Sequence, residues 1–368
     1  MDLFRVSRMC EPKLMQQVSE KCEWMFDLGD CETGRKVQEL IDTEIEEIRS
    51  DTVPTEPLVS VWLITYNHRS YIEQAIESVL EQETDFPFEI VIGDDFSTDG
   101  TREIVLNYQR KYPDRIRLIL AKRNLWNPFP EMPGTVTAME LYQTCGRAPF
   151  MALLEGDDYW CDQTKLQRQI DVLQNDDSVA LVFHSWKVDR PGISPKLDQK
   201  LWKDRQRMDF STVLQYWCIR TCSMVFRTPA GLPGWFCEVH GGDKFLAYLL
   251  LTKGDAIYLD RPMCVYRVHD GNITAAVNNS GRDQAYEHRV NRYSAGLKRL
   301  DGATVGKYSS TIRRAERLHR YARAVKRSAS LGGRVWFQLC FLINMTSHHW
   351  LWMAHKAVDR FRRGNRET

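Results

Sequence analysis

Residues 58–95 read LVSVWLITYNHRSYIEQAIESVLEQETDFPFEIVIGDD, and this stretch decides the fold class. Residues 58–65 form a nearly continuous apolar run, which is typical of a strand buried on both faces. Apolar side chains then recur at helical spacing over residues 72–80, and a second strand is predicted at 88–93. This order of strand, helix and strand predicts a parallel β-α-β unit.

The same alternation continues along the chain. Further strands are predicted at 116–120, 150–154 and 179–183. Further helices are predicted at residues 101–112 and around Leu166, Ile170 and Leu173. This rhythm predicts an α/β fold with a mostly parallel, doubly wound sheet flanked by helices. In such sheets ligands bind beyond the carboxyl ends of the strands, so we expect the functional residues there.

Two extensions are expected to flank an α/β domain at residues 58–275. In the first, residues 1–57, a set of apolar residues at helical spacing predicts an amphipathic helix: Val37, Leu40, Ile41, Ile45 and Ile48. Two prolines within residues 51–57 predict a linker after it. The second extension, residues 276–368, is also expected to be helical.

The composition of the 368-residue chain is that of an ordinary globular protein with two or three domains. Its 43% hydrophobic and 27% charged residues exclude a disordered chain, a collagen-like repeat and a polytopic membrane protein. Ten cysteines without a CxxC pair predict reduced thiols in a cytoplasmic protein. The N-terminal residues do not read as a signal peptide.

The net charge of +1 hides an uneven distribution. Residues 281–368 hold 19 Lys and Arg against 6 Asp and Glu. A basic amphipathic segment at 307–334, followed by an aromatic and interrupted apolar segment at 335–353, predicts peripheral contact with an anionic membrane surface. A helix packed on the rest of the protein is the alternative. Nucleic acid is not an expected partner, because no recognised binding module accompanies the charge.

Polar residues follow three of the predicted strands. They read TYNH at 65–68, DDFSTDGT at 94–101 and EGDDYW at 155–160. Each motif alone also fits a turn or a helix cap. Adjacent carboxylates repel each other, however, and a divalent cation with hard oxygen ligands, Mg²⁺ or Mn²⁺, relieves that repulsion.

In these three motifs the sequence resembles a family 2 glycosyltransferase of bacterial type with the GT-A fold. Two later motifs, GDKFL at 242–246 and YRVH at 266–269, and the KLQRQ stretch at 165–169 also match that family. The resemblance runs from about residue 57 to about residue 274. It implies transfer of a sugar from a nucleotide-sugar donor, most simply a UDP-sugar.

The resemblance also implies roles for individual residues. The donor is expected to contact Thr65, Tyr66, Asn67, Asp94, Asp95, Asp157 and Arg267. Asp158 is the first choice as a ligand of Mg²⁺ or Mn²⁺, and His269 is a second ligand. Both Arg267 and His269 also fit a structural loop that closes over the site.

Asp243 matches the position of the general base of inverting members of the family. A general base takes the proton of the acceptor hydroxyl as that hydroxyl attacks the sugar. An Asp at this point also fits the N-terminal cap of the helix that the apolar residues after it predict.

The sequence departs from the family pattern after the third strand. Relatives often carry Asn-x-Gly there, whereas this chain has Asn124, Leu125 and Trp126. The Trp- and Tyr-rich residues 201–237 lie where family members bind acceptors, and they fit either sugar stacking or a core.

The sequence therefore predicts a metal-dependent, inverting glycosyltransferase that acts on a glycan or a lipid-linked acceptor in the synthesis of a surface polysaccharide or a related glycan. It is expected on the inner face of the cell membrane. The alternatives are a catalytically silent scaffold subunit and a nucleotidyltransferase that makes a sugar nucleotide. The second usually has a Gly-rich loop after the first strand, and residues 65–69 have none.

Overall fold

The computed structural model describes residues 39, 42–125, 147–197, 202, 204–215, 217–229, 232–233, 235–236, 239–269 and 284–317. The chain divides into two compact units. The first comprises Met1–Met208 and Ile219–Gly296, and the second comprises Asp209–Cys218 and Leu297–Thr368.

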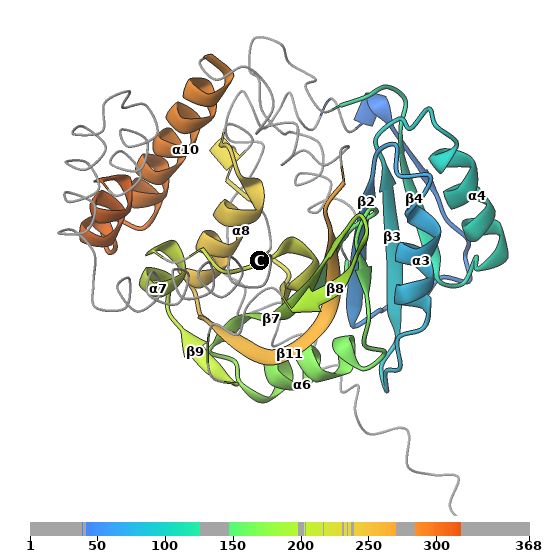
Figure 1. Cartoon of the computed structure of the whole chain (residues 1–368), viewed down its shortest axis with the longest axis horizontal. Helices are drawn as coiled ribbons and strands as arrows, with labels where there is room; N and C mark the ends of the chain where they lie inside the picture. The colour runs from blue at the N-terminus through green and yellow to red at the C-terminus, as the bar shows by residue number, and fades with distance from the viewer. Residues whose placement is uncertain are drawn as a thin grey trace, which may run out of the picture. The chain divides into compact units, whose positions relative to one another are not determined.

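One mixed sheet forms the centre of the first unit (Figure 1). Its strands are β1 (Ile45–Ile48), β2 (Val59–Thr65), β3 (Phe88–Asp94), β4 (Ile116–Ala121), β5 (Phe150–Glu155), β6 (Tyr159–Trp160), β7 (Val179–Arg190), β8 (Ile193–Leu197), β9 (Gln206–Met208), β10 (Val225–Arg227) and β11 (Asp255–Arg267). The order across the sheet is β1-β4-β3-β2-β5-β10-β7-β11-β6, with β8 paired to β7 and β9 to β11.

The central strands β4, β3, β2 and β5 pair in parallel, and β7 pairs in parallel with β11. Strand β10 lies antiparallel between β5 and β7. The predicted α/β class with a mostly parallel central sheet flanked by helices is therefore confirmed.

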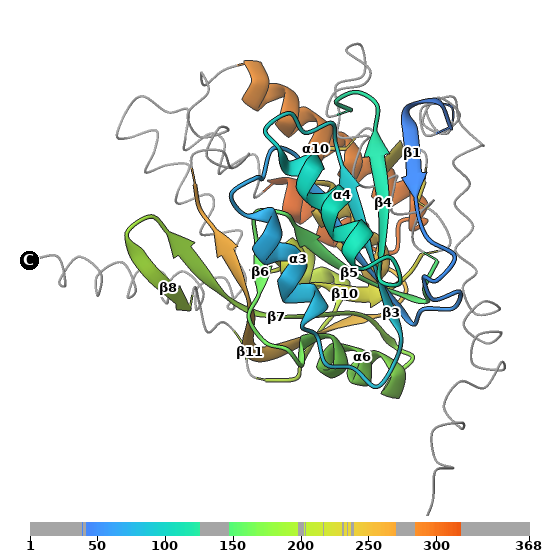
Figure 2. The same ribbon diagram turned by 90° about the vertical axis from the view of Figure 1, so that its right-hand side faces the viewer.

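Helices cover this sheet as the apolar spacing predicts. They are α3 (Ile72–Leu80), α4 (Thr101–Lys111), α6 (Lys165–Asn175) and α8 (Gly242–Leu251), with a short 3₁₀ turn, η2 (Thr221–Ser223). Both α3 and α4 lie on the same face of β2, β3 and β4 (Figures 1 and 2). Every residue of β3 and β4 is buried, which explains why both strands are mostly apolar. The charged Glu89 and Arg117 within them pair with each other at 3.1 Å.

Two further helices lie toward the C-terminus, α7 (Phe210–Gln215) and α10 (Gln284–Ala303). Within the second unit the rings of Phe210 and Tyr308 stack, with their centroids 4.1 Å apart. None of the described helices has the length and hydropathy needed to cross a membrane.

The predicted N-terminal helix is wrong over residues 45–48. These residues form β1, which pairs antiparallel with β4, Ile45 opposite Ala121 and Ile48 opposite Leu118. The edge of β4 offers a row of unpaired N–H and C=O groups, and pairing with that row outweighs the weak helical periodicity.

Some predictions fall outside the described residues. They concern the start of the N-terminal helix at Val37 and Leu40, the position of Trp126, and the basic and aromatic segments beyond residue 317 that carry the predicted membrane contact.

Candidate active site

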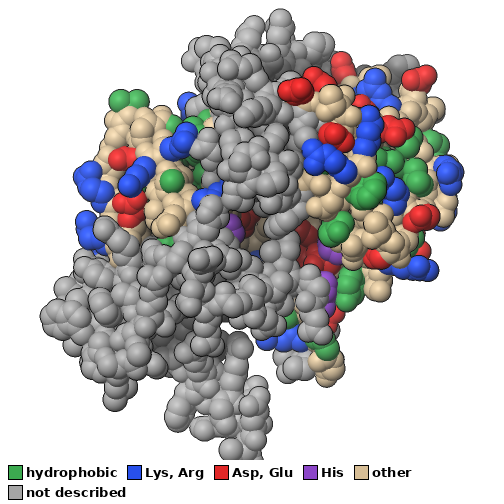
Figure 3. Space-filling view, turned by 90° about the horizontal axis from the view of Figure 1, so that it is seen from above, with side chains coloured by type: hydrophobic (Ala, Val, Ile, Leu, Met, Phe, Trp, Pro, Cys, Tyr) green, Lys and Arg blue, Asp and Glu red, His purple; other side chains and the backbone are tan. Residues whose placement is uncertain are grey.

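The carboxyl ends of β2, β3 and β5 meet at one edge of the sheet. Thr65 at the end of β2 pairs with Asp94 at the end of β3, and Ile64 pairs with Glu155 at the end of β5. The three polar motifs therefore begin side by side, as the sequence predicts. In Figure 3 acidic and histidine side chains lie close together near the centre of the view.

The turn after β2 is hydrogen-bonded to the loop after β3. Asn67 adopts a left-handed backbone conformation, with φ of 54°, which asparagine tolerates better than most residues. Its backbone N–H donates to Ser97 Oγ at 2.9 Å, and its side-chain oxygen accepts from the Thr98 N–H at 2.9 Å. Tyr66 beside it is 44% exposed. The turn therefore has a fixed shape and presents an accessible aromatic ring.

Asp94 is a buried carboxylate with one oxygen in use. Its Oδ2 accepts from Arg102 Nε at 2.5 Å and from the Ser97 N–H at 3.3 Å. Its Oδ1 is buried and has no hydrogen-bond partner among the described residues. Sequence reasoning missed Arg102, although it lies in the first turn of the predicted helix after this motif.

Asp95 is held by the loop after β4. Its carboxylate accepts from the Leu125 N–H at 2.7 Å and from the Asn124 side-chain amide at 3.1 Å. Burial raises the pKa of Asp95 to about 6, and the Leu125 hydrogen bond opposes that rise. Asn124 and Leu125, which fit the first two positions of the family's Asn-x-Gly pattern, thus supply two donors to a predicted donor-binding residue.

Two histidines lie close to the Asp157 carboxylate. Its Oδ2 lies 3.1 Å from His269 Nε2 and 3.9 Å from His68 Nε2. Burial lowers the pKa of His68, and the negative charge of Asp157 opposes that change. The structure therefore brings His269 to Asp157. His68 was missed from sequence, although it is the last residue of the TYNH motif.

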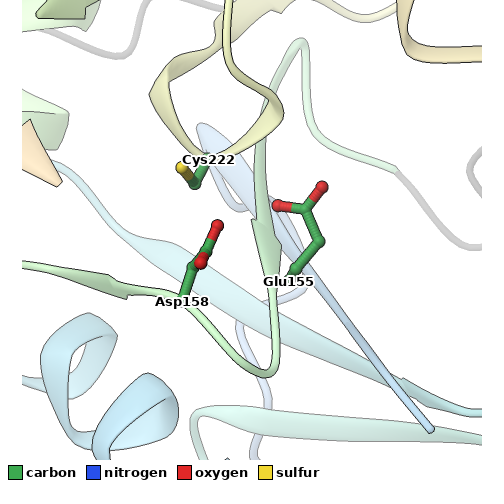
Figure 4. A group of neighbouring side chains, drawn as sticks. All are labelled: Glu155, Asp158 and Cys222. Carbon is green, nitrogen blue, oxygen red and sulfur yellow. The ribbon is translucent and has the colours of Figure 1, made fainter. Parts of the chain in front are cut away.

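Asp158 points to a different set of groups. Its Oδ1 accepts from the Arg267 backbone N–H at 2.9 Å. Its carboxylate also lies beside Glu155 and Cys222 (Figure 4). Burial raises the pKa of Asp158 well above its ordinary value, and the neighbouring Cys222 and Glu155 raise it further. Asp158 and His269, the two predicted metal ligands, thus face different partners.

Arg267 stabilises the turn at residues 155–158, which we call the acidic turn. Its guanidinium donates to the Asp157 backbone oxygen at 2.8 Å and to the side chain of Gln74. It also lies over two rings, 4.4 Å from the Tyr159 centroid and 5.2 Å from the Tyr71 centroid. The residue predicted to contact the donor therefore also positions the carboxylate-bearing turn.

Asp243 lies in the first turn of α8, which begins at Gly242 as predicted. The residue before the helix, Gly241, has φ of 85°, a conformation that favours glycine. Burial raises the pKa of Asp243, and the positive charges of Lys244 and Arg220 oppose that rise. The charge of Asp243 in turn contributes to a raised pKa at Glu155, so the structure brings Asp243 within electrostatic reach of the acidic turn.

Gly156 is the point of closest approach between the acidic turn and the turn after β2. A Cβ atom there would lie 2.8 Å from Thr65 Oγ1 and 2.9 Å from His68 Nδ1. We expect Gly156→Ala to lower the free energy of unfolding by about 1–3 kcal/mol, because packed surroundings relax only in part around an added methyl group. Denaturant unfolding measures this change.

Gly302→Ala is the matched control for that substitution. Gly302 lies in α10 with nothing within 4 Å of the Cβ position. Alanine there should stabilise the protein by roughly 0.5–1 kcal/mol. Equal effects of the two substitutions would show that the turn is not closely packed.

Comparison with known proteins finds a family that one segment of the chain resembles. Residues 60–129 match the family described as Glycosyl transferase family 2. This segment of the chain is similar to that family. The matched residues run from β2 through the acidic motif after β3 to the loop after β4, and so include five of the ten residues that the sequence predicts for the site.

Two relatives extend the similarity beyond that segment. An uncharacterized protein of Mycobacterium tuberculosis is 29% identical over 58% of this chain and 60% of its own length. An uncharacterized glycosyltransferase of Nostoc sp. is 28% identical over 64% of this chain and 74% of its own. The chain thus spans about three fifths of the length of the mycobacterial relative.

Among solved structures, TarS 1–349 of S. aureus in complex with UDP aligns with 78% of this chain and 88% of its own, at 18% identity and a TM-score of 0.46.

Proposed function

We propose that the protein transfers a sugar from a nucleotide-sugar donor to an acceptor hydroxyl, with inversion at the sugar. The observation that carries this proposal is the meeting of three polar motifs at one sheet edge of a family 2 domain, with Asp243 in electrostatic contact with them. Ligands bind at this edge in doubly wound sheets.

The donor's nucleoside is proposed to lie against the ends of β2 and β3. The Asp95 carboxylate is the acceptor there, the buried Asp94 carboxylate precedes it at the end of β3, and Thr65, Tyr66 and Asn67 form the adjoining turn. A carboxylate accepts the imide N–H of uracil, so a UDP-sugar is the donor that we propose. Asp157 and Arg267 belong to the turn that we expect beside the ribose and the diphosphate.

A divalent cation, Mg²⁺ or Mn²⁺, fits the donor set at the acidic turn. Carboxylate oxygen and imidazole nitrogen are ligands that Mn²⁺ accepts, and Asp157 Oδ2 and His269 Nε2 lie 3.1 Å apart. We therefore propose Asp157 and His269 as the protein ligands. Asp158, the first choice from sequence, is the alternative, although one of its oxygens already accepts from Arg267. When bound, such a cation neutralises charge on the leaving diphosphate.

Asp243 is proposed as the general base. Its carboxylate takes the proton of the acceptor hydroxyl while the hydroxyl oxygen bonds to the anomeric carbon and the bond to the diphosphate oxygen breaks. Lys244 and Arg220 support this role, because their positive charges favour the ionised form of Asp243 that a base requires.

The acceptor is proposed to be a glycan or a lipid-linked sugar in the synthesis of a surface polysaccharide or a related glycan, on the inner face of the membrane. The segments that would attach the protein to anionic lipid lie outside the described residues. Deleting residues 332–368 and measuring sedimentation with anionic liposomes at low salt tests the attachment, since salt screens such attraction.

Binding calorimetry with UDP and GDP, each with and without Mn²⁺, tests the donor proposal. We expect UDP to bind more tightly with Mn²⁺ and more tightly than GDP does. Equal affinity for the two nucleotides would contradict the assignment of the base pocket, and binding of neither would contradict the function.

The raised pKa of Asp95 predicts pH-dependent recognition of the base. Protonation below a pKa of about 6 removes the acceptor of the imide N–H, so the affinity for uridine should fall by up to about tenfold per pH unit below that value. Uridine is the probe because it carries no phosphate. Affinity that stays constant between about pH 5 and pH 7, or the same fall in Asp95→Asn, would contradict this role.

A further inference from the structure

Arg220, the residue before η2, places a positive charge beside the proposed general base. Arg220 and Lys244 are the two charged side chains that act most strongly on Asp243. The Arg220 side chain is half-buried, yet its guanidinium forms no hydrogen bond or salt bridge with the described residues. Burying a charge is costly unless an opposite charge balances it, so this guanidinium indicates a negatively charged ligand.

Two aromatic rings hold the Arg220 guanidinium by its faces. Its central carbon lies 4.4 Å from the centroid of the Tyr266 ring and 5.5 Å from that of the Trp186 ring. Such contacts use the flat face of the group, whereas its N–H donors point outward in the plane of the guanidinium. The donors therefore stay available to a ligand while the rings fix the position of the charge.

The backbone at Arg220 is fixed as well. Its carbonyl oxygen accepts from the Ser223 N–H at 2.9 Å and from Ser223 Oγ at 2.7 Å. The next turn of chain is tied to β6, because the Cys222 carbonyl oxygen accepts from the Trp160 indole N–H at 3.1 Å. The cation is thus held in place in advance, so an anion that binds there orders little further structure.

The diphosphate of the donor and an acidic group on the acceptor are the two candidate ligands. The diphosphate already has a counter-charge, the cation proposed at Asp157 and His269. Arg220 acts instead on Asp243, the residue proposed to contact the acceptor hydroxyl. An acidic acceptor is repelled by the Asp243 carboxylate unless positive charges beside it compensate, and Arg220 and Lys244 supply two such charges against one.

We propose that Arg220, with Lys244 beside it, binds a carboxylate or phosphate group of the acceptor, next to the hydroxyl that reacts. The acceptor is then an acidic glycan, one that carries a uronate or a phosphate. A guanidinium gives two parallel hydrogen bonds to either group. This inference rests on the proposed function, because it assigns the acceptor side of the same site.

Binding of three sugars to the full chain loaded with UDP and Mn²⁺ tests the inference. Glucose, glucuronate and glucose 6-phosphate differ only at carbon 6, and NMR titration measures their affinities. UDP fills the diphosphate site, so a preference for an acidic sugar reports a second anion site. We expect at least one of the acids to bind about tenfold more tightly than glucose, and which acid does so distinguishes a carboxylate from a phosphate.

Variants of Arg220 assign that preference to its guanidinium. Arg220→Gln should remove the preference and keep the UDP affinity within a few-fold. Arg220→Lys keeps the charge but not the paired donors, so it should lower the preference by about threefold or more. Arg110→Gln, at an exposed arginine in the last turn of α4, is the matched control and should change neither quantity. Any effect on the ionisation of Asp243 cancels, because the sugars are compared within one protein.

The outcomes separate this inference from the proposed function. Equal affinity for the three sugars in wild type that binds UDP overturns the inference alone. Loss of UDP affinity in Arg220→Gln with the preference kept assigns Arg220 to the diphosphate and also overturns it. Wild type that binds no UDP overturns the proposed function, and the inference with it. If Arg220→Gln does not fold, an unchanged preference in Arg220→Lys overturns the inference instead.

Discussion

Asp243→Asn should lower turnover by about 10²–10⁴-fold, because a general base typically contributes that much to the rate. Asparagine keeps the size of the side chain and most of its hydrogen bonding but cannot accept the proton. The affinity for UDP should stay within a few-fold, since the proposed role of Asp243 is toward the acceptor. Steady-state kinetics and calorimetry on the same preparation measure both quantities.

The same substitution distinguishes a general base from a residue that only caps helix α8. The residue that precedes α8 is Gly241, and Asp243 lies inside the first turn. Asparagine is about as good a cap as aspartate, so a residue that only stabilises the helix would leave turnover and melting temperature near normal. Asp114→Asn, at an exposed aspartate in the turn before β4, is the control and should change neither. Near-normal turnover of Asp243→Asn would contradict the role of Asp243 as the general base.

Asp157→Asn should abolish the part of UDP affinity that depends on Mn²⁺ and reduce transfer to background. Asparagine still accepts hydrogen bonds but supplies no negative charge to a cation. We expect the gain in affinity on adding Mn²⁺ to fall by about tenfold or more, which corresponds to about 1.4 kcal/mol. Calorimetry with and without Mn²⁺ measures this gain in each variant.

Asp158→Asn is the matched comparison, because Asp158 is the adjacent carboxylate and the ligand first predicted from sequence. Its Oδ1 accepts from the Arg267 backbone N–H, and asparagine can keep that hydrogen bond, so this substitution should leave both the melting temperature and the effect of Mn²⁺ near normal. The reverse result, with the effect of Mn²⁺ lost in Asp158→Asn and kept in Asp157→Asn, would restore the original assignment.

The central fold could be predicted because its signals are local. β3 and β4 are buried along their whole length, so both are mostly apolar, and Ile72, Ile76 and Val79 of α3 are buried. The strand at residues 45–48 could not be predicted in this way, because it forms by pairing with the edge of β4, which is far away in the sequence. Ile45 and Ile48 fit helical spacing equally well in isolation.

The location of the site could be predicted from the sequence, but the contacts of its individual side chains could not. Motifs after β2, β3 and β5 had to meet at the carboxyl edge of a parallel sheet. Neighbouring residues of a tight turn point in different directions, however, and sequence does not say which way. Asp157 therefore contacts His269, while Asp158 faces Glu155 and Cys222. The ion pair of Arg102 with Asp94 likewise depends on how a helix packs on the sheet.

Release of nucleoside diphosphate from a panel of UDP- and GDP-sugars, by the purified full chain with Mn²⁺, tests the central claim most directly. The account predicts release from at least one UDP-sugar, loss of that release in excess chelator, and a fall of about 10²-fold or more in Asp243→Asn. No release from any sugar nucleotide by the folded protein, or equal release by wild type and Asp243→Asn, would contradict it.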